Sequence, residues 1–228
     1  MTPLLLLPGL ACDAGLWAHQ LGALGDVAAM TVGDTLQDDS LGAMAERVLA
    51  DAPDRFALAG LSMGGYLAFE LLRRAPQRVT RLALLDTSAR PDTPEQTANR
   101  LAAIEATGKY DFAALARTSL AQLVAPDAAQ AVRDTVVAMS VRVGAETYAR
   151  QQRAIMARPD SRALLGEIAV PTLVLVGARD ALTPPAIAAE IATGIPGAAL
   201  HEIAGSGHLS PLEAPAAVSA ALRAWLAN

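Results

Sequence analysis

The stretch Gly60-Leu61-Ser62-Met63-Gly64-Gly65 decides the fold, because it joins a short apolar run to a stretch of helical period. The run before it, Arg55 to Ala59, predicts a buried strand. A serine between glycines at such a strand-to-helix turn is typical of a nucleophile elbow, where only small neighbours at Gly60 and Gly64 fit the sharp bend. The hydroxyl of Ser62 would then lie at a helix N-terminus, whose partial positive charge favours developing negative charge. A serine N-cap in a plain glycine turn is the alternative.

Five further apolar runs, each bounded by turn residues, alternate with longer stretches of helical period. These runs are Leu4 to Leu7, Val27 to Val32, Arg81 to Leu85, Thr172 to Val176 and Ala198 to Ile203. The helical stretches are Leu41 to Ala52, Met63 to Ala75, Pro185 to Thr193 and Ala214 to Ala227. The alternation predicts an α/β fold, with a mostly parallel sheet of about six strands and crossover helices.

One segment, residues 91–166, breaks this alternation. It contains no strand-like run, and its apolar residues recur at helical spacing in two places. These are Phe112, Leu115, Ala116, Leu120 and Leu123, and then Val132, Val136, Met139 and Val143. We therefore predict a core made of residues 1–90 and 167–228, with residues 91–166 as a helical insertion between two strands.

A serine hydroxyl needs a base to remove its proton, and the chain has three histidines, His19, His201 and His208. His208 lies in the loop Gly205-Ser206-Gly207-His208-Leu209, after the last predicted strand, where a parallel sheet presents its carboxyl-end loops. His19 is expected on the surface or in a loop, and His201 falls within the final strand. His208 is therefore the predicted base.

The base needs a carboxylate on its other ring nitrogen to fix its tautomer. Asp180 follows the strand Thr172 to Val176 through a short loop, which places it at the same edge and gives the chain order nucleophile, acid, base. Asp86, directly after another strand, is the competing acid, and Asp34 is a weaker one.

Two backbone N–H groups are required to stabilise the oxyanion of acyl transfer. We predict the amide of Met63, next to the nucleophile, and the amide of Leu10, in the loop Pro8 to Trp17 after the first strand. A simple glycine turn is the alternative for that loop. Cys12 is expected to be a small wall residue.

Composition narrows the function classes. The chain has 228 residues, 53% of them hydrophobic, which suits one domain with a sizeable core. Its net charge is −5 and its 18 Lys and Arg residues are scattered, which argues against a nucleic-acid partner. The single Cys12 allows no internal disulfide, and no targeting peptide or long uncharged apolar stretch is seen. A cytoplasmic enzyme with no membrane partner is expected.

Together these motifs resemble the α/β-hydrolase fold family, in its compact esterase, enol-lactonase, haloperoxidase-like and C–C hydrolase branch. The resemblance covers almost the whole chain and rests on Pro8-Gly9-Leu10, the Ser62 motif, Gly177-Ala178-Arg179-Asp180 and Gly205-Ser206-Gly207-His208. Two departures are that Pro8-Gly9 replaces the usual His-Gly, and that the first strand corresponds to the family's third.

The resemblance implies that the insertion is a lid and that the reaction is acyl transfer to water, without a metal or organic cofactor. Ester hydrolysis is the leading reaction; lactone, thioester or C–C bond hydrolysis, lyase or perhydrolase chemistry, and a ligand-binding receptor are the alternatives. The substrate is expected to be a small molecule with a small or aliphatic acyl group, because only 4% of residues are aromatic. Candidate pocket residues, any of which could instead be core, are Trp17, Tyr66, Phe112, Leu115 and Met139. The oligomeric state stays open.

Overall fold

The computed structural model describes residues 1–227 and contains one sheet of six parallel strands in the order β2-β1-β3-β4-β5-β6. The strands are β1 (Thr2–Leu7), β2 (Ala28–Val32), β3 (Phe56–Leu61), β4 (Val79–Leu85), β5 (Thr172–Gly177) and β6 (Ala199–Ile203). The predicted parallel sheet of six strands is confirmed.

Burial along the strands follows their place in the sheet. Every residue of β3 and β5 is buried, as expected for inner strands covered on both faces. The edge strands are more exposed: in β2 exposed positions alternate with buried or half-buried ones, and only the last residue of β6 is buried. His201 therefore lies exposed on an edge strand.

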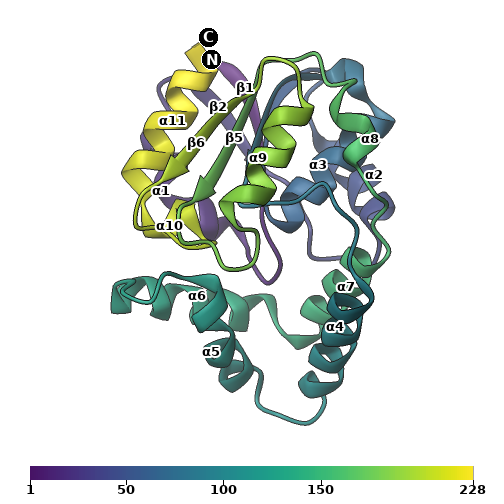
Figure 1. Cartoon of the computed structure of the whole chain (residues 1–228), viewed down its shortest axis with the longest axis vertical. Coiled ribbons are helices and arrows are strands. Elements are labelled where there is room, and N and C mark those ends of the chain that lie inside the picture. Colours follow the sequence, from purple (N-terminus) through teal and green to yellow (C-terminus); the bar gives the residue numbers. More distant parts are fainter. Residues whose placement is uncertain (228) are drawn as a thin grey trace.

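Two helical layers sandwich the sheet, and each encloses its own apolar cluster (Figure 1). One face is covered by α2 (Leu41–Asp51), α3 (Met63–Arg74), α8 (Arg162–Leu165) and α9 (Pro185–Gly194). The other face is covered by η1 (Ala14–Trp17), α1 (Ala18–Ala23), α10 (Ser210–Glu213) and α11 (Pro215–Ala227). A short 3-10 helix, η2 (Pro76–Arg78), leads into β4.

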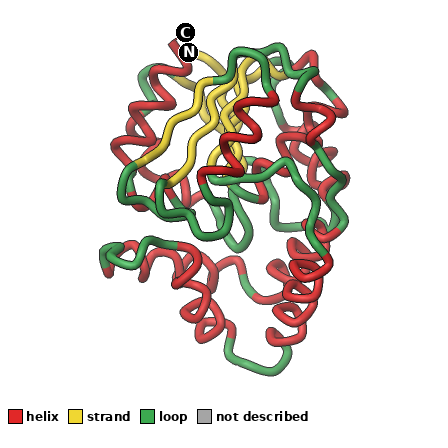
Figure 2. Tube along the Cα trace, in the orientation of Figure 1, coloured by secondary structure: helices red, strands yellow, loops and turns green. Residues whose placement is uncertain are grey.

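Five helices separate β4 from β5, and the four that precede α8 form the bulk of the insertion. These four are α4 (Pro94–Thr107), α5 (Phe112–Leu123), α6 (Gln130–Val143) and α7 (Ala145–Met156). Local caps begin two of them: Thr93 and Gln96 form a capping box on α4, and the Asp111 carboxylate accepts from Ala114 N at α5. In Figures 1 and 2 these helices lie beyond one end of the strands, opposite the chain termini.

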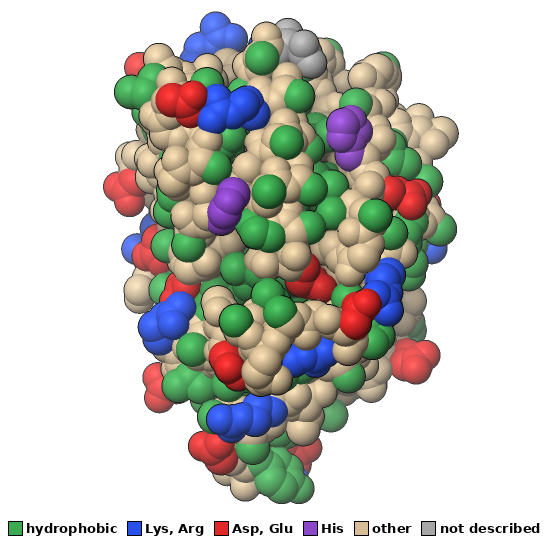
Figure 3. Space-filling view, turned by 90° about the vertical axis from the view of Figure 1, so that its left-hand side faces the viewer, with side chains coloured by type: hydrophobic (Ala, Val, Ile, Leu, Met, Phe, Trp, Pro, Cys, Tyr) green, Lys and Arg blue, Asp and Glu red, His purple; other side chains and the backbone are tan. Residues whose placement is uncertain are grey.

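The surface in Figure 3 carries positive and negative side chains interspersed, without one sign gathered over a large area of that face. Among the helices of residues 1–227, none is both long enough and apolar enough to span a bilayer.

Candidate active site

Ser62 sits in the tight turn between β3 and α3. Its backbone has φ 54° and ψ −113°, a strained conformation that L residues rarely adopt. The turn leaves no room for side chains beside it, because a Cβ on Gly60 would lie 2.3 Å from the carbonyl oxygen of Gly64. Thr87 braces it by donating its hydroxyl to the Ser62 carbonyl at 2.8 Å.

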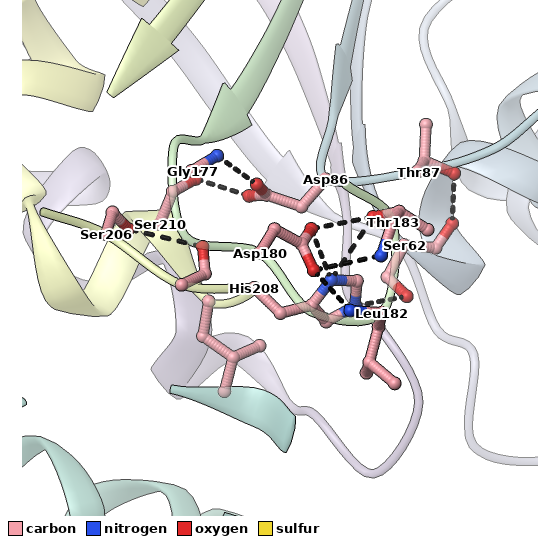
Figure 4. Close-up of polar contacts among 12 residues, drawn as sticks. Ser62, Asp86, Thr87, Gly177, Asp180, Leu182, Thr183, Ser206, His208 and Ser210 are labelled. Atoms are coloured by element: carbon pink, nitrogen blue, oxygen red, sulfur yellow. Dashed lines mark hydrogen bonds and ion pairs between the residues drawn. The ribbon is translucent and has the colours of Figure 1, made fainter. Parts of the chain in front are cut away.

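The structure brings Ser62, His208 and Asp180 into one hydrogen-bonded line (Figure 4). His208 Nε2 lies 2.9 Å from Ser62 Oγ, and its Nδ1 lies 2.8 Å from Asp180 Oδ2. The residues come from the loops after β3, β5 and β6, which all end at the same edge of the sheet. With its Nδ1 proton held by the carboxylate, the imidazole presents Nε2 as an acceptor to the serine hydroxyl.

The carboxylate of Asp180 is held on both oxygens. Oδ1 accepts the backbone N–H groups of Leu182 and Thr183 at 2.8 and 2.9 Å, and Oδ2 accepts the Thr183 hydroxyl at 2.7 Å. Because these bonds and His208 satisfy a side chain that is buried, the carboxylate can orient the imidazole without moving.

The loop that carries His208 is held by Glu213 of α10. Its carboxylate accepts the N–H groups of Gly207 and Leu209, the two neighbours of His208, at 3.0 and 3.1 Å. The same carboxylate accepts the N–H of Ala125, in the segment between α5 and α6, at 2.7 Å. Glu213 therefore ties the base's loop to the helical insertion.

Burial and charge shift the two ionisable groups in ways that suit a base and its acid. Burial alone would lower the pKa of His208, but the hydrogen bond and charge of Asp180, with the charges of Asp86 and Glu213, hold it above its ordinary value. Burial raises the pKa of Asp180, yet the charge and hydrogen bond of His208 and the bonds from Thr183 leave it below its usual value. Asp180 therefore stays ionised beside the base.

Asp86, the competing acid, makes no hydrogen bond to His208. Its carboxylate accepts the N–H of Gly177 at 2.7 Å and the hydroxyl of Ser210, and so links β4, β5 and α10 behind the catalytic line. Burial raises the pKa of Asp86 to about 7. Asp34, the weaker candidate, has a local partner instead: its carboxylate accepts the N–H of Leu36 in a turn.

The two predicted oxyanion donors lie in segments next to Ser62. The Met63 amide follows Ser62 directly, and the loop of Leu10 lies against it, because a Cβ on Gly9 would be 3.5 Å from Ser62 Cβ. Within residues 1–227, neither amide donates to a protein acceptor. Both N–H groups are thus open to a ligand.

The next amide in that loop is engaged by the helical insertion. Ala11, which has φ 56°, donates its N–H to Oε1 of Gln151 on α7 at 2.9 Å. Gln151 is fully buried, and its Nε2 donates to the carbonyl of Thr35 at 3.0 Å. These partners fix the orientation of the side-chain amide, because one is a backbone N–H and the other a backbone C=O.

A cavity of about 540 Å³ opens over Ser62 and His208, between the sheet edge and the helical insertion. Three of the predicted pocket residues line it, namely Tyr66, Phe112 and Leu115, and Leu10 lines it as well. The predicted pocket residues Trp17 and Met139 do not: both are fully buried in the apolar cluster on the α1 and α11 face. Helical spacing of apolar residues does not distinguish a side chain packed in the core from one facing a cavity.

Sequence reasoning missed the residues that hold the site in place. Gln151 and Glu213 reach the insertion or the first loop through partners 140 and 88 positions away, which no local motif records. Thr183 and Glu213 also contact residues three to six positions away, within the loops that the sequence singled out. His19, by contrast, is exposed as expected, with its Nδ1 3.0 Å from Ser219 Oγ on α11.

Comparison with known proteins agrees with this geometry. Residues 28–215 match the family model described as the alpha/beta hydrolase fold. A pimeloyl-[acyl-carrier protein] methyl ester esterase of Aromatoleum aromaticum is 32% identical over 196 residues, covering 80% of this chain and 78% of that protein.

Two solved structures extend the likeness over the whole chain. A thermophilic esterase from Thermogutta terrifontis has a TM-score of 0.92 at 31% identity, covering 100% of this chain and 90% of the other. The enol-lactonase from Burkholderia xenovorans LB400 has a TM-score of 0.88 at 26% identity, with 100% and 92% covered. The chain is thus a hydrolase that belongs to the α/β-hydrolase fold family.

Proposed function

We propose that the protein is a serine hydrolase that cleaves carboxylic esters with small or aliphatic acyl groups through an acyl-enzyme on Ser62. The observation that carries the proposal is the unbroken line from Ser62 Oγ through His208 to Asp180, with contacts of 2.9 and 2.8 Å. Asp180, His208 and Ser62 would act as acid, base and nucleophile, and no metal or organic cofactor takes part.

In the first half of the reaction, Ser62 Oγ attacks the ester carbonyl carbon while its proton passes to His208 Nε2. The carbonyl oxygen becomes an oxyanion that accepts the N–H groups of Leu10 and Met63. The intermediate then collapses, the bond to the alcohol oxygen breaks, and the imidazolium of His208 gives its proton to the departing alcohol.

In the second half, water replaces the alcohol. His208 takes a proton from the water as it attacks the acyl carbon, and a second oxyanion forms in the same place. Collapse returns the proton to Ser62 Oγ and releases the carboxylic acid. Asp180 stabilises the imidazolium in both halves.

The helical insertion is proposed to act as a lid that selects the acyl group. Residues 1–90 and 167–228 would form the hydrolase core, and residues 91–166 the lid. This division is supported by the cavity wall, to which α5 contributes Phe112, Leu115 and Leu123 while the core contributes the reacting groups.

Lactone hydrolysis is a second candidate for the same three residues. It is supported by the likeness to the Burkholderia xenovorans enol-lactonase at 26% identity. The chemistry differs only in that the leaving alcohol remains attached to the acyl group. The esterases at 31% and 32% identity favour the open-chain ester as the first substrate to test.

The test is hydrolysis of p-nitrophenyl esters of increasing acyl length by the wild-type protein and by Ser62→Ala. We expect kcat to fall by at least about 10³-fold in the variant, as losses of a catalytic nucleophile do. Ser219→Ala is the matched control, because Ser219 also contacts a histidine, His19, at 3.0 Å but lies outside the cavity.

Undiminished turnover by Ser62→Ala would refute the role of Ser62. If neither protein turns over p-nitrophenyl esters, labelling with a fluorophosphonate decides the mechanism. A label on Ser62 would leave the serine mechanism standing and move the substrate to lactones, thioesters or C–C bonds; no label would reject the mechanism.

A further inference from the structure

The cavity wall formed by α4, α7 and their adjoining segments carries an unbalanced positive charge. Three arginines line the cavity, Arg90, Arg100 and Arg158, and none of its lining residues is Asp or Glu. Arg90 is exposed and is neutralised by Glu190, which it contacts at 2.8 and 3.0 Å. The other two arginines are more enclosed.

Arg100 and Arg158 share a single carboxylate. Asp92 Oδ2 lies 2.7 Å from Arg100 Nε, and its Oδ1 lies 2.6 Å from Arg158 Nη1. The Asp92 side chain is 1% exposed, so it lies behind the guanidinium groups rather than in the cavity wall. Within residues 1–227 no other acidic side chain is in ion-pair distance of either arginine, which leaves one positive charge without a partner. Such a charge favours an anionic ligand, because an enclosed charge is costly when unpaired.

Hydrogen-bond donors without acceptors face the same region. Arg158 donates Nε to the carbonyl of Arg90 and Nη1 to that of Ile155, both at 3.0 Å, whereas its Nη2 has no acceptor within residues 1–227. Tyr148 accepts Gln152 Nε2 at 2.7 Å, so its own hydroxyl proton remains free to donate. Gln152 Oε1 in turn accepts Arg100 Nη1 at 2.7 Å, which fixes the direction of this chain of bonds.

This group of donors lines the same cavity as Ser62. The Arg158 guanidinium lies over the ring of Tyr66, 4.3 Å from its centroid. Tyr66 is one helical turn beyond Ser62 and donates its backbone N–H to the Ser62 carbonyl at 3.2 Å. Because Ser62 and both arginines line the same cavity, a ligand attached to Ser62 can extend toward the arginines, while Phe112 and Leu115 of α5 offer an apolar wall.

From these contacts we infer that the substrate carries a carboxylate, which is bound by Arg158, Arg100 and the Tyr148 hydroxyl while Ser62 attacks the ester carbonyl. The inference rests on the proposed function and narrows its substrate class to esters that bear a carboxylate. A planar carboxylate matches the paired N–H donors of a guanidinium, which explains why arginine rather than lysine suits this wall.

The test compares charged and neutral esters of equal length. On the acyl side, monomethyl succinate, glutarate and adipate are compared with methyl esters of monocarboxylic acids of equal chain length. On the alcohol side, acetylglycolate is compared with propyl acetate. We expect the charged ester of at least one side to have a kcat/KM about ten-fold higher, mainly through a lower KM, because the carboxylate is bound equally in the ground and transition states.

Three variants locate the effect. In Arg100→Gln and Arg158→Gln the preference for the charged ester should fall about ten-fold, to near unity. Arg162→Gln should keep it, because Arg162 forms an exposed ion pair with Asp160 outside the cavity. In the wild-type protein, which needs no variant to fold, pentanoate should inhibit neutral-ester hydrolysis about ten-fold more strongly than pentanamide, its uncharged analogue of equal length.

Equal or better turnover of the neutral esters by the wild type would overturn the carboxylate subsite. A preference that persists in both Arg100→Gln and Arg158→Gln would also overturn it, as would equal inhibition by pentanoate and pentanamide. Hydrolysis of neutral esters that depends on Ser62 would in each case leave the proposed function intact, so the two ideas fail separately.

Discussion

The sheet edge that carries Ser62, His208 and Asp180 and the helical insertion that covers it are organised by different means. At the sheet edge, polar side chains are buried and paired: Asp180 alone accepts bonds from two amides, one hydroxyl and one imidazole. In the insertion, half-buried side chains such as Phe112 and Leu115 line the cavity, and donors such as Tyr148 keep free protons. The difference indicates that the core holds Ser62, His208 and Asp180 in fixed positions, whereas the insertion presents side chains that tolerate change, as expected of the lid proposed above.

Two side-chain contacts join these regions at the loops that matter for chemistry. Gln151 of α7 accepts the N–H of Ala11, in the loop that carries the proposed oxyanion donor Leu10, and Glu213 of α10 holds both the His208 loop and Ala125 of the insertion. The insertion is therefore bonded to the segments that carry the proposed oxyanion donor and the base. Substitutions at the sheet edge and in the insertion should therefore differ in the size of their effect on activity and in whether they change kcat or KM.

The largest difference in activity is expected between variants of the two buried acids of the sheet edge, Asp180 and Asp86. Asp180→Asn should lower kcat on the order of 10⁴-fold, because the neutral amide supports the wrong tautomer of His208. Asp86→Asn should retain most of the activity, since an amide can still accept the N–H of Gly177 and donate to the Ser210 hydroxyl. Steady-state kinetics on one ester checks both; a large loss in Asp86→Asn with little loss in Asp180→Asn would exchange their roles.

The pH profile should report the charge on His208. As a base it works only when neutral, so kcat/KM should rise with pH and fall about ten-fold for each unit below the pKa of the free enzyme. Since Asp180 raises that pKa above 6.5, the midpoint should lie above 6.5. In Asp180→Asn the residual activity should have a lower midpoint, because the carboxylate charge is gone. A midpoint below 6.5 in the wild type would contradict this account.

Sequence predicts the sheet edge better than the insertion for a physical reason. Buried strands, glycine-dependent turns and loops at the carboxyl ends of strands leave local patterns, which is why Ser62, His208 and Asp180 could be selected and are found together. The role of Gln151 depends on a partner 140 positions away, which no local pattern records. Trp17 and Met139, two pocket candidates for which the core was the alternative, lie in the core, because an apolar residue in a loop or a helix has no local mark of which side it faces.

Breaking the contact between Gln151 of the insertion and Ala11 should have an intermediate effect on kcat. Gln151→Met keeps the volume but leaves the N–H of Ala11 without its acceptor, so the loop bearing the Leu10 amide should shift. Loss of an oxyanion donor itself costs about 10²–10³-fold, and a displaced one should cost about ten-fold in kcat, with little change in KM.

Gln20→Met is the matched control for that loss. Gln20 is also fully buried and donates to the carbonyl of Pro215, but it lies outside the cavity. Both variants should lose a similar amount of thermal stability, measured as Tm, and only Gln151→Met should lose kcat. A trifluoromethyl ketone forms a tetrahedral adduct that resembles the transition state. Its affinity for Gln151→Met should fall by the same factor as kcat/KM. Equal kinetics in the two variants would make Gln151 a structural residue only.

The smallest effect is expected within the insertion, where the cavity wall can be changed without disturbing the sheet edge. Leu115→Ala removes side-chain volume from the α5 wall and so enlarges the cavity. The kcat/KM for longer acyl chains should therefore rise relative to that for short ones, through KM. The shift should be roughly two- to five-fold, below the ten-fold that a buried methylene can supply, because Leu115 is only half buried. Leu101→Ala on α4 is the control, since Leu101 is 55% exposed and does not line the cavity.

The measurement is kcat/KM for p-nitrophenyl esters of increasing length. A change in kcat that is uniform across all lengths would mean that α5 affects the reacting groups as well, and the division between a fixed sheet edge and a variable insertion would no longer hold.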